Sequence, residues 1–122
     1  MEVGSDRRQL SRVPAIYAVT FEHFLGSRKI GYGYAQSVNI SGRGLLFETT
    51  QPVGSNDTLI LWLNAPQYAL HVRGIVVHAH RTGRGLWRVG VRLDEVIEGD
   101  WHLLERDIEH RLEKGNSASL QA

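Results

Sequence analysis

Six short segments between residues 15 and 93 alternate apolar with polar residues, the spacing of a β-strand with one buried face. In 87–93, for example, one tryptophan, two valines and one leucine alternate with two arginines and one glycine. Turn-forming residues separate the segments, and no helical period lies between them. The predicted strands are 15–24, 30–38, 44–49, 58–63, 68–80 and 86–93. This series predicts an antiparallel sheet closed into a small barrel, because closure removes exposed strand edges.

The period changes after residue 98, where apolar residues recur at helical spacing. A helix is predicted over about 101–114, with Asp100 as its N-cap and Gly115 as its C-terminal glycine. Asp107 and Arg111 form a supporting pair one turn apart. The apolar stripe consists of Trp101, Leu104, Ile108 and Leu112. We expect this stripe to pack over an opening of the barrel, and a partner-binding helix is the alternative.

These patterns predict one all-β domain: a six-stranded antiparallel β-barrel with a C-terminal α-helix. The expected divisions are a flexible N-terminal arm at 1–14, the barrel at 15–98, the helix at 99–115 and a disordered tail at 116–122. A chain of 122 residues is long enough to bury a core of its own.

Composition excludes several classes of function. No run of about 18 apolar residues predicts a membrane span, and the N-terminus lacks the apolar region of a secretory signal. Cysteine is absent, which excludes disulfides and thiolate chemistry and fits the cytoplasm. The net charge of +1 argues against binding a nucleic-acid polymer, so an anion site must be local.

The first polar motif is an R-x-x-x-R in the arm, formed by Arg8 and Arg12 with Arg7 directly before it. A guanidinium group donates two parallel hydrogen bonds, either to the oxygens of a phosphate or to the O6 and N7 atoms of guanine. Residues four apart in an extended chain lie roughly 13 Å apart, so both arginines reach different groups of one dinucleotide-sized ligand. Taken alone, the motif is common by chance, and a solvated basic arm or pairing with Asp6 explains it better than a ligand does.

The second polar motif is an N-x-S-x-x-G that runs from Asn39 to Gly44. Gly42 and Gly44 permit positive φ and a close approach of ligand to backbone, and consecutive N–H groups in such a turn bind anions. Ser41 offers a hydroxyl to a phosphate oxygen and Asn39 an amide to a base edge, and Arg43 belongs to the same candidate set. The alternative is a turn in which Asn39 and Ser41 cap their own backbone. One hairpin separates the two motifs, so we expect the turn to return beside the arm.

Other signals are weak. The stretch Gly31-Tyr32-Gly33 resembles the start of a dinucleotide fingerprint, but no helix follows it. His78 and His80 share a strand face without a second ligand pair, so we predict packed or exposed histidines rather than a zinc site. No nucleophile elbow, phosphate-binding loop or paired carboxylates are present. We therefore predict no catalytic residue, no metal site and no cofactor, and we expect that the protein is not an enzyme.

Together, the two motifs and their order resemble the PilZ domain. The resemblance continues through Val53-Gly54, through the Gly-Ile-Val-Val stretch at 74–77 and through the closing strand at 88–93, and it covers roughly residues 7–97. It implies a six-stranded barrel that binds cyclic di-GMP, a bacterial second messenger. His78 stands where the family often has Trp.

The resemblance also implies roles for the motif residues. Arg8 and Arg12 would wrap over the ligand and contact guanine and phosphate, while Asn39, Ser41 and Gly44 match the second motif. The family often has Asp in place of Asn39; an amide offers one acceptor oxygen, whereas a carboxylate accepts from both N1–H and N2–H of guanine. Arg7, before the first motif, favours two stacked ligand molecules, because an added cation offsets their crowded phosphates.

Three functions are compared. The first is a cytoplasmic, non-enzymatic receptor for cyclic di-GMP whose arm orders over the ligand and changes a protein-interaction surface; as a single domain it would act in trans on an unidentified protein partner. The second is a ligand-blind adaptor that works by protein contacts alone. The third is a barrel for single-stranded nucleic acid, which needs a basic groove with exposed aromatic residues.

Overall fold

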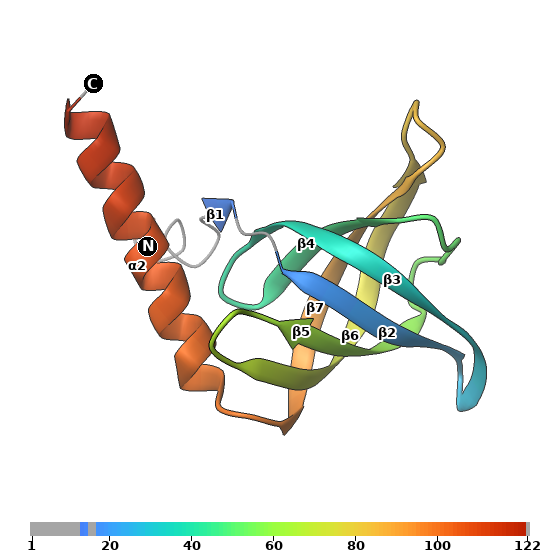
Figure 1. Cartoon of the computed structure of the whole chain (residues 1–122). Helices are drawn as coiled ribbons and strands as arrows, with labels where there is room; N and C mark the ends of the chain where they lie inside the picture. The colour runs from blue at the N-terminus through green and yellow to red at the C-terminus, as the bar shows by residue number, and fades with distance from the viewer. Residues whose placement is uncertain (1–12, 15–16, 122) are drawn as a thin grey trace, which may run out of the picture.

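The strands form a closed barrel in a computed structural model that describes residues 13–14 and 17–121 (Figure 1). In chain order the elements are β1 (Val13–Pro14), β2 (Ala18–Leu25), β3 (Arg28–Ile40), β4 (Gly44–Thr49), β5 (Thr58–Asn64), β6 (Ala69–Arg81), β7 (Trp87–Glu98) and α2 (Trp101–Gln121). The barrel runs in the order β3-β2-β5-β6-β7-β4 and closes by pairing of β4 with β3. All of these pairings are antiparallel. The predicted six-stranded antiparallel barrel with a C-terminal helix is confirmed, and the short β1 is an addition beside β3.

The core lies inside the barrel and is lined by the alternating apolar residues of its strands. The rings of Phe21 and Phe47 meet near its middle, with centroids 5.6 Å apart. Burying a Leu, Val or Phe side chain stabilises a fold by about 1.5–3 kcal/mol, so this set is the main source of stability. Its members include Val19, Phe21, Leu45, Phe47, Leu59, Leu61, Leu63, Leu70, Val72, Val76, Val89, Val91 and Leu93.

Two glycines are required by close packing inside the barrel. A Cβ atom on Gly33 would lie 2.8 Å from Cζ of Phe21, and one on Gly74 would lie 2.4 Å from Cγ1 of Val91. The pairing of β2 with β3 also shifts register between His23 and Phe24, next to the pair of His23 with Gly31, and a glycine within a strand often marks such a bulge.

Helix α2 lies across one end of the barrel and closes it (Figure 1). Leu104 and Ile108 are buried in the core, and Trp101 and Leu112 pack against it, so the predicted stripe is confirmed. The Asp100 carboxylate accepts a hydrogen bond from the backbone N–H of His102 at 2.9 Å, which makes it the predicted N-cap. Among the described residues no helix has the length and hydropathy of a membrane-spanning segment.

Three elements are longer than their sequence patterns predict. Strand β3 continues past residue 38 to Ile40, β7 continues past residue 93 to Glu98, and α2 continues through Gly115 to Gln121. The sequence predicts a helix end at Gly115 and a disordered tail at 116–122. Asn39 disfavours a strand by itself, but neighbouring strands satisfy its backbone. A single glycine costs a helix only about 1 kcal/mol relative to alanine, so it need not end one.

Candidate functional site

The short strand β1 lies beside the start of the second polar motif. Val13 pairs with Ile40 and Pro14 pairs with Asn39, on the edge of β3 that β2 occupies further along. Asn39 is the first residue of N-x-S-x-x-G, and Val13 directly follows the last arginine of R-x-x-x-R. The structure therefore places Val13 and Pro14 beside the turn, and the return of the turn to the arginines of the arm stays a prediction. Arg7, Arg8 and Arg12 themselves lie outside the described residues.

The second motif forms a tight connection between β3 and β4. The backbone N–H of Ser41 donates to the carbonyl oxygen of Gly44 at 2.9 Å, and the N–H of Leu93 donates to the carbonyl oxygen of Arg43 at 2.8 Å. These bonds fix the turn against β7. Because the N–H of Ser41 is used inside the turn, an anion there must be bound by other groups.

The glycines of this turn have a different role from the predicted one. The glycines with positive φ in the described part of the chain are Gly26, Gly85 and Gly99, so Gly42 and Gly44 do not adopt the left-handed conformation. The prediction that Gly42 and Gly44 supply positive φ is wrong for this conformation. Their lack of a side chain still leaves the backbone open to close approach.

Five predicted site residues are thus brought together: Asn39, Ser41, Gly42, Arg43 and Gly44. A register shift between Ser37 and Asn39 places the motif at the end of β3. The Ser41 side chain is nearly buried, whereas Arg43 is exposed. Ser37 fixes the start of β2, since its hydroxyl accepts from the N–H of Tyr17 at 2.6 Å.

Arg43 contacts helix α2. Its guanidinium carbon lies 4.8 Å from the ring centroid of Trp101, within the range of a cation–π contact. The sequence places Trp101 on the apolar stripe of the helix but gives no sign of this contact, because the two residues are far apart in the chain. Trp101 is thus a neighbour of the motif that sequence reasoning missed.

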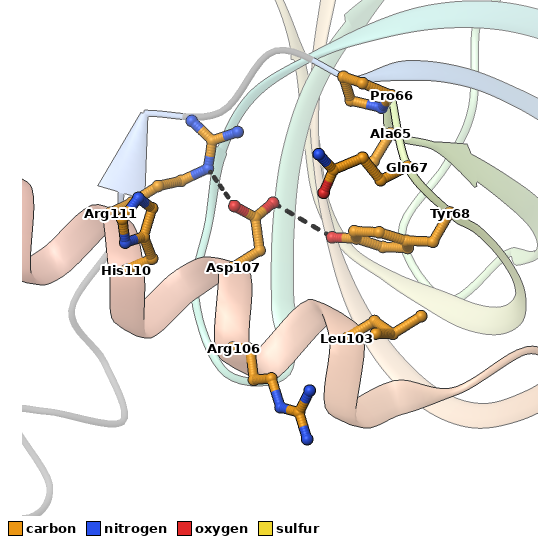
Figure 2. Close-up of a pocket in the computed structure, with 9 residues that line it drawn as sticks. All are labelled: Ala65, Pro66, Gln67, Tyr68, Leu103, Arg106, Asp107, His110 and Arg111. Carbon is orange, nitrogen blue, oxygen red and sulfur yellow. Dashed lines mark hydrogen bonds and ion pairs between the residues drawn. The ribbon is translucent and has the colours of Figure 1, made fainter.

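A polar network joins the middle of α2 to the barrel (Figure 2). The Asp107 carboxylate accepts hydrogen bonds from the hydroxyls of Tyr17 and Tyr68, the latter at 3.2 Å. Its other oxygen accepts from Nε of Arg111 at 3.1 Å, which confirms the predicted pair. The guanidinium of Arg111 also lies 5.7 Å from the Tyr17 ring centroid. Apart from the pair Asp107 and Arg111, the sign of this network in the sequence is Tyr17, which shares a strand face with Val19 and Phe21 and whose hydroxyl needs a partner when buried.

The network shifts the pKa values of its members. Burial would raise the pKa of Asp107, but the hydrogen bond from Tyr17, the charge of Arg111 and the hydrogen bond from Tyr68 together lower it. Burial raises the pKa of Tyr68, and so do its neighbours Tyr17 and Asp107. The hydroxyls therefore stay protonated as donors while Asp107 stays ionised as their acceptor.

A cavity of about 470 Å³ opens beside this network, between α2 and the connection from β5 to β6 (Figure 2). Gln67 and Tyr68 form one side, and Arg106, His110 and Arg111 form the other. We call the set Tyr17, Arg43, Tyr68, Trp101, Asp107 and Arg111 the helix end of the barrel.

A second surface lies on the outer face of β2, β3 and β5. Tyr32 and Tyr34 are 69% and 73% exposed, and they border a shallow cavity of about 270 Å³ with Trp62. The Trp62 ring stacks on His71, with centroids 3.8 Å apart. Glu22, on the same face, is paired with Lys29 at 2.9 Å. We call Tyr32, Tyr34 and Trp62 the aromatic wall; its aromatic rings suit base stacking, but Glu22 makes the surface unlike a basic groove.

The two histidines considered for zinc are exposed, with ring centroids 6.2 Å apart. The His78 ring covers Gly90, since a Cβ on that glycine would lie 2.3 Å from its Nε2. Within residues 13–14 and 17–121 no group of three or more His, Asp or Glu residues is placed to hold a metal ion.

Comparisons with known proteins agree with this geometry. The PilZ domain model matches residues 6–110 of the chain. The structure is similar to that of the inhibitor of motility (MotI/DgrA) from Bacillus subtilis, with a TM-score of 0.64, 16% identity and coverage of 87% of this chain. This chain spans 50% of that protein. It is also similar to the PilZ domain of YcgR from Escherichia coli, solved with c-di-GMP, with a TM-score of 0.61, 10% identity and coverage of 92% of this chain and 96% of that one. No curated protein sequence matches the chain.

Proposed function

This chain belongs to the PilZ domain family, and we propose that it is a receptor for cyclic di-GMP that binds its ligand where the two motifs meet. The observation that carries the proposal is the pairing of Val13 and Pro14 with Ile40 and Asn39. This pairing puts Val13, the residue directly after the R-x-x-x-R motif in the sequence, beside the N-x-S-x-x-G motif, and so supports a site to which both motifs contribute. The YcgR domain, which has the same fold, was solved with c-di-GMP.

We assign the proposed contacts by chemistry. Arg8 and Arg12 close over the ligand and bind its phosphates and guanine edges, because a guanidinium group forms paired hydrogen bonds with either. Asn39 accepts from guanine with its single amide oxygen. The Ser41 hydroxyl donates to a phosphate oxygen, and the backbone at Gly42 and Gly44 lies close to the ligand.

Arg7 favours binding of two stacked ligand molecules, whose four phosphate charges need more cations than one molecule does. Closure of the arm would change the surface at this end of the barrel. We propose that this change alters contact with a protein partner in trans, in a bacterial cytoplasm and without catalysis.

Calorimetric titration with cyclic di-GMP tests the proposal. We expect saturable heat for the natural chain and none for Arg12→Ala, with the unfolding temperature of the ligand-free protein nearly unchanged. The Ser41→Ala variant should bind more weakly than the natural chain but better than Arg12→Ala, because the backbone contacts remain. If Arg12→Ala binds normally, the role given to the arm is wrong.

The second candidate is a ligand-blind adaptor, and one observation favours it. Asn39 replaces the Asp that the family often has, which removes one acceptor for guanine. The same titration separates the two candidates: a folded chain that gives no heat at high ligand concentration is an adaptor. An Asn39→Asp variant that gains binding would then identify this residue as the cause.

A further inference from the structure

The contact between Arg43 and Trp101 links the second motif to helix α2, and the backbone is held in place at both residues. On the motif side, the carbonyl oxygen of Arg43 accepts from the N–H of Leu93 at 2.8 Å. On the helix side, Trp101 is the first residue of α2 and packs against the core, and Asp100 caps the helix beside it. The Arg43 side chain reaches from one to the other, with its guanidinium carbon 4.8 Å from the centroid of the Trp101 ring.

In the described part of the chain, the Arg43 guanidinium forms no ion pair. The ion pairs of the described residues involve other arginines, such as Arg88 with Glu48 at 2.5 Å and Arg73 with Asp94 at 3.3 Å. The Trp101 ring is the partner that the structure gives to Arg43. One face of a guanidinium that lies on an indole is covered by the ring, although Arg43 as a whole is exposed.

We propose that Trp101 is a positioning residue of the ligand site: its ring holds Arg43, and through Arg43 it holds the Asn39–Gly44 turn ready for cyclic di-GMP. This inference rests on the proposed function. The contact adds to the backbone hydrogen bonds that fix this glycine-containing turn, and holding the turn more firmly before the ligand arrives lowers the ordering cost of binding. Arg43 thus contributes through the helix rather than by gripping the ligand.

A double-mutant cycle distinguishes positioning from gripping. We expect Arg43→Ala and Trp101→Leu each to weaken binding about twofold to fivefold, the range of an exposed cation–π contact. The combined variant should bind no more weakly than either single variant, because both changes break the same contact. If Arg43 grips the ligand directly, Arg43→Ala will weaken binding equally with or without Trp101, and the proposal is overturned.

Conservative variants separate positioning from folding. Trp101→Phe keeps a ring for the guanidinium and should bind like the natural chain. If Trp101→Leu fails to fold, Arg43→Gln breaks the same contact without changing the core, and it should weaken binding as Arg43→Ala does. The matched control is Trp62→Leu, which removes an exposed indole on the aromatic wall and should leave binding unchanged.

Fluorescence gives a direct readout of the contact. In a Trp62→Phe/Trp87→Phe background Trp101 is the only tryptophan, and Arg43→Ala should alter its emission without ligand. If cyclic di-GMP gives no calorimetric heat with the natural chain, the proposed function fails and this inference fails with it. If the ligand binds but the two single variants match the natural chain, only the positioning role is overturned.

Discussion

The helix end and the aromatic wall both display aromatic rings, but they differ in what those rings contact. At the helix end, Tyr17 is 1% exposed and its hydroxyl is bonded to Asp107. On the aromatic wall, Tyr34 is 73% exposed and stands in solvent. The same residue type therefore contributes to the stability of the fold at the helix end but not on the aromatic wall. Changes in stability should therefore separate the two regions.

The largest effect on stability is expected where helix α2 packs into the core. Leu104→Ala empties a site that is 0% exposed, and we expect a loss of about 2–5 kcal/mol in the free energy of unfolding. Urea denaturation measures it, and Leu103→Ala, one residue away and 36% exposed, is the control. Equal losses for the two variants would show that α2 does not contribute its stripe to the core.

The next effect comes from the polar network. Asp107→Asn removes the charged acceptor shared by Tyr17, Tyr68 and Arg111, and we expect a loss of about 1–3 kcal/mol at neutral pH. Glu109→Gln, an equal change of charge on an exposed position of α2, should be close to neutral. A loss in Glu109→Gln as large as that in Asp107→Asn would assign the effect to net charge instead.

The same network predicts a dependence of stability on pH. The pKa of Asp107 is lower in the folded chain than its unfolded value of about 3.9, so its contribution is fully present above that value. It is lost as the pH falls through the lower folded pKa. Unfolding measured from pH 7 to pH 2 should show the difference between the natural chain and Asp107→Asn shrinking below about pH 4. A difference that stays constant to pH 2 would contradict this account.

The smallest effect belongs to the aromatic wall. Tyr34→Ala should change the free energy of unfolding by less than about 0.5 kcal/mol, because the ring is mostly in solvent. Thermal unfolding measures it beside Tyr17→Ala, which removes a buried ring and a hydrogen bond. A large loss in Tyr34→Ala would mean that the wall belongs to the fold.

The barrel could be predicted because its strands repeat a simple alternation, and the helix because its stripe has a different period. The ends of elements could not, since the strand at Asn39 pairs with Pro14 on one edge and Leu46 on the other, which no local pattern reveals. The turn residues were found from their motif. Their backbone conformation depends on hydrogen bonds to β7, and the Trp101 contact depends on how α2 packs; both are tertiary properties.

We propose that the ligand site lies at the junction of β1 with the Asn39–Gly44 turn, and not on the aromatic wall. The most direct test is a titration of the isotope-labelled protein with cyclic di-GMP, followed by backbone amide chemical shifts. The account predicts that the largest shifts fall at Val13 and at residues 39–44, with little change at Tyr32 and Tyr34. Large shifts on the aromatic wall with an unchanged turn would contradict it.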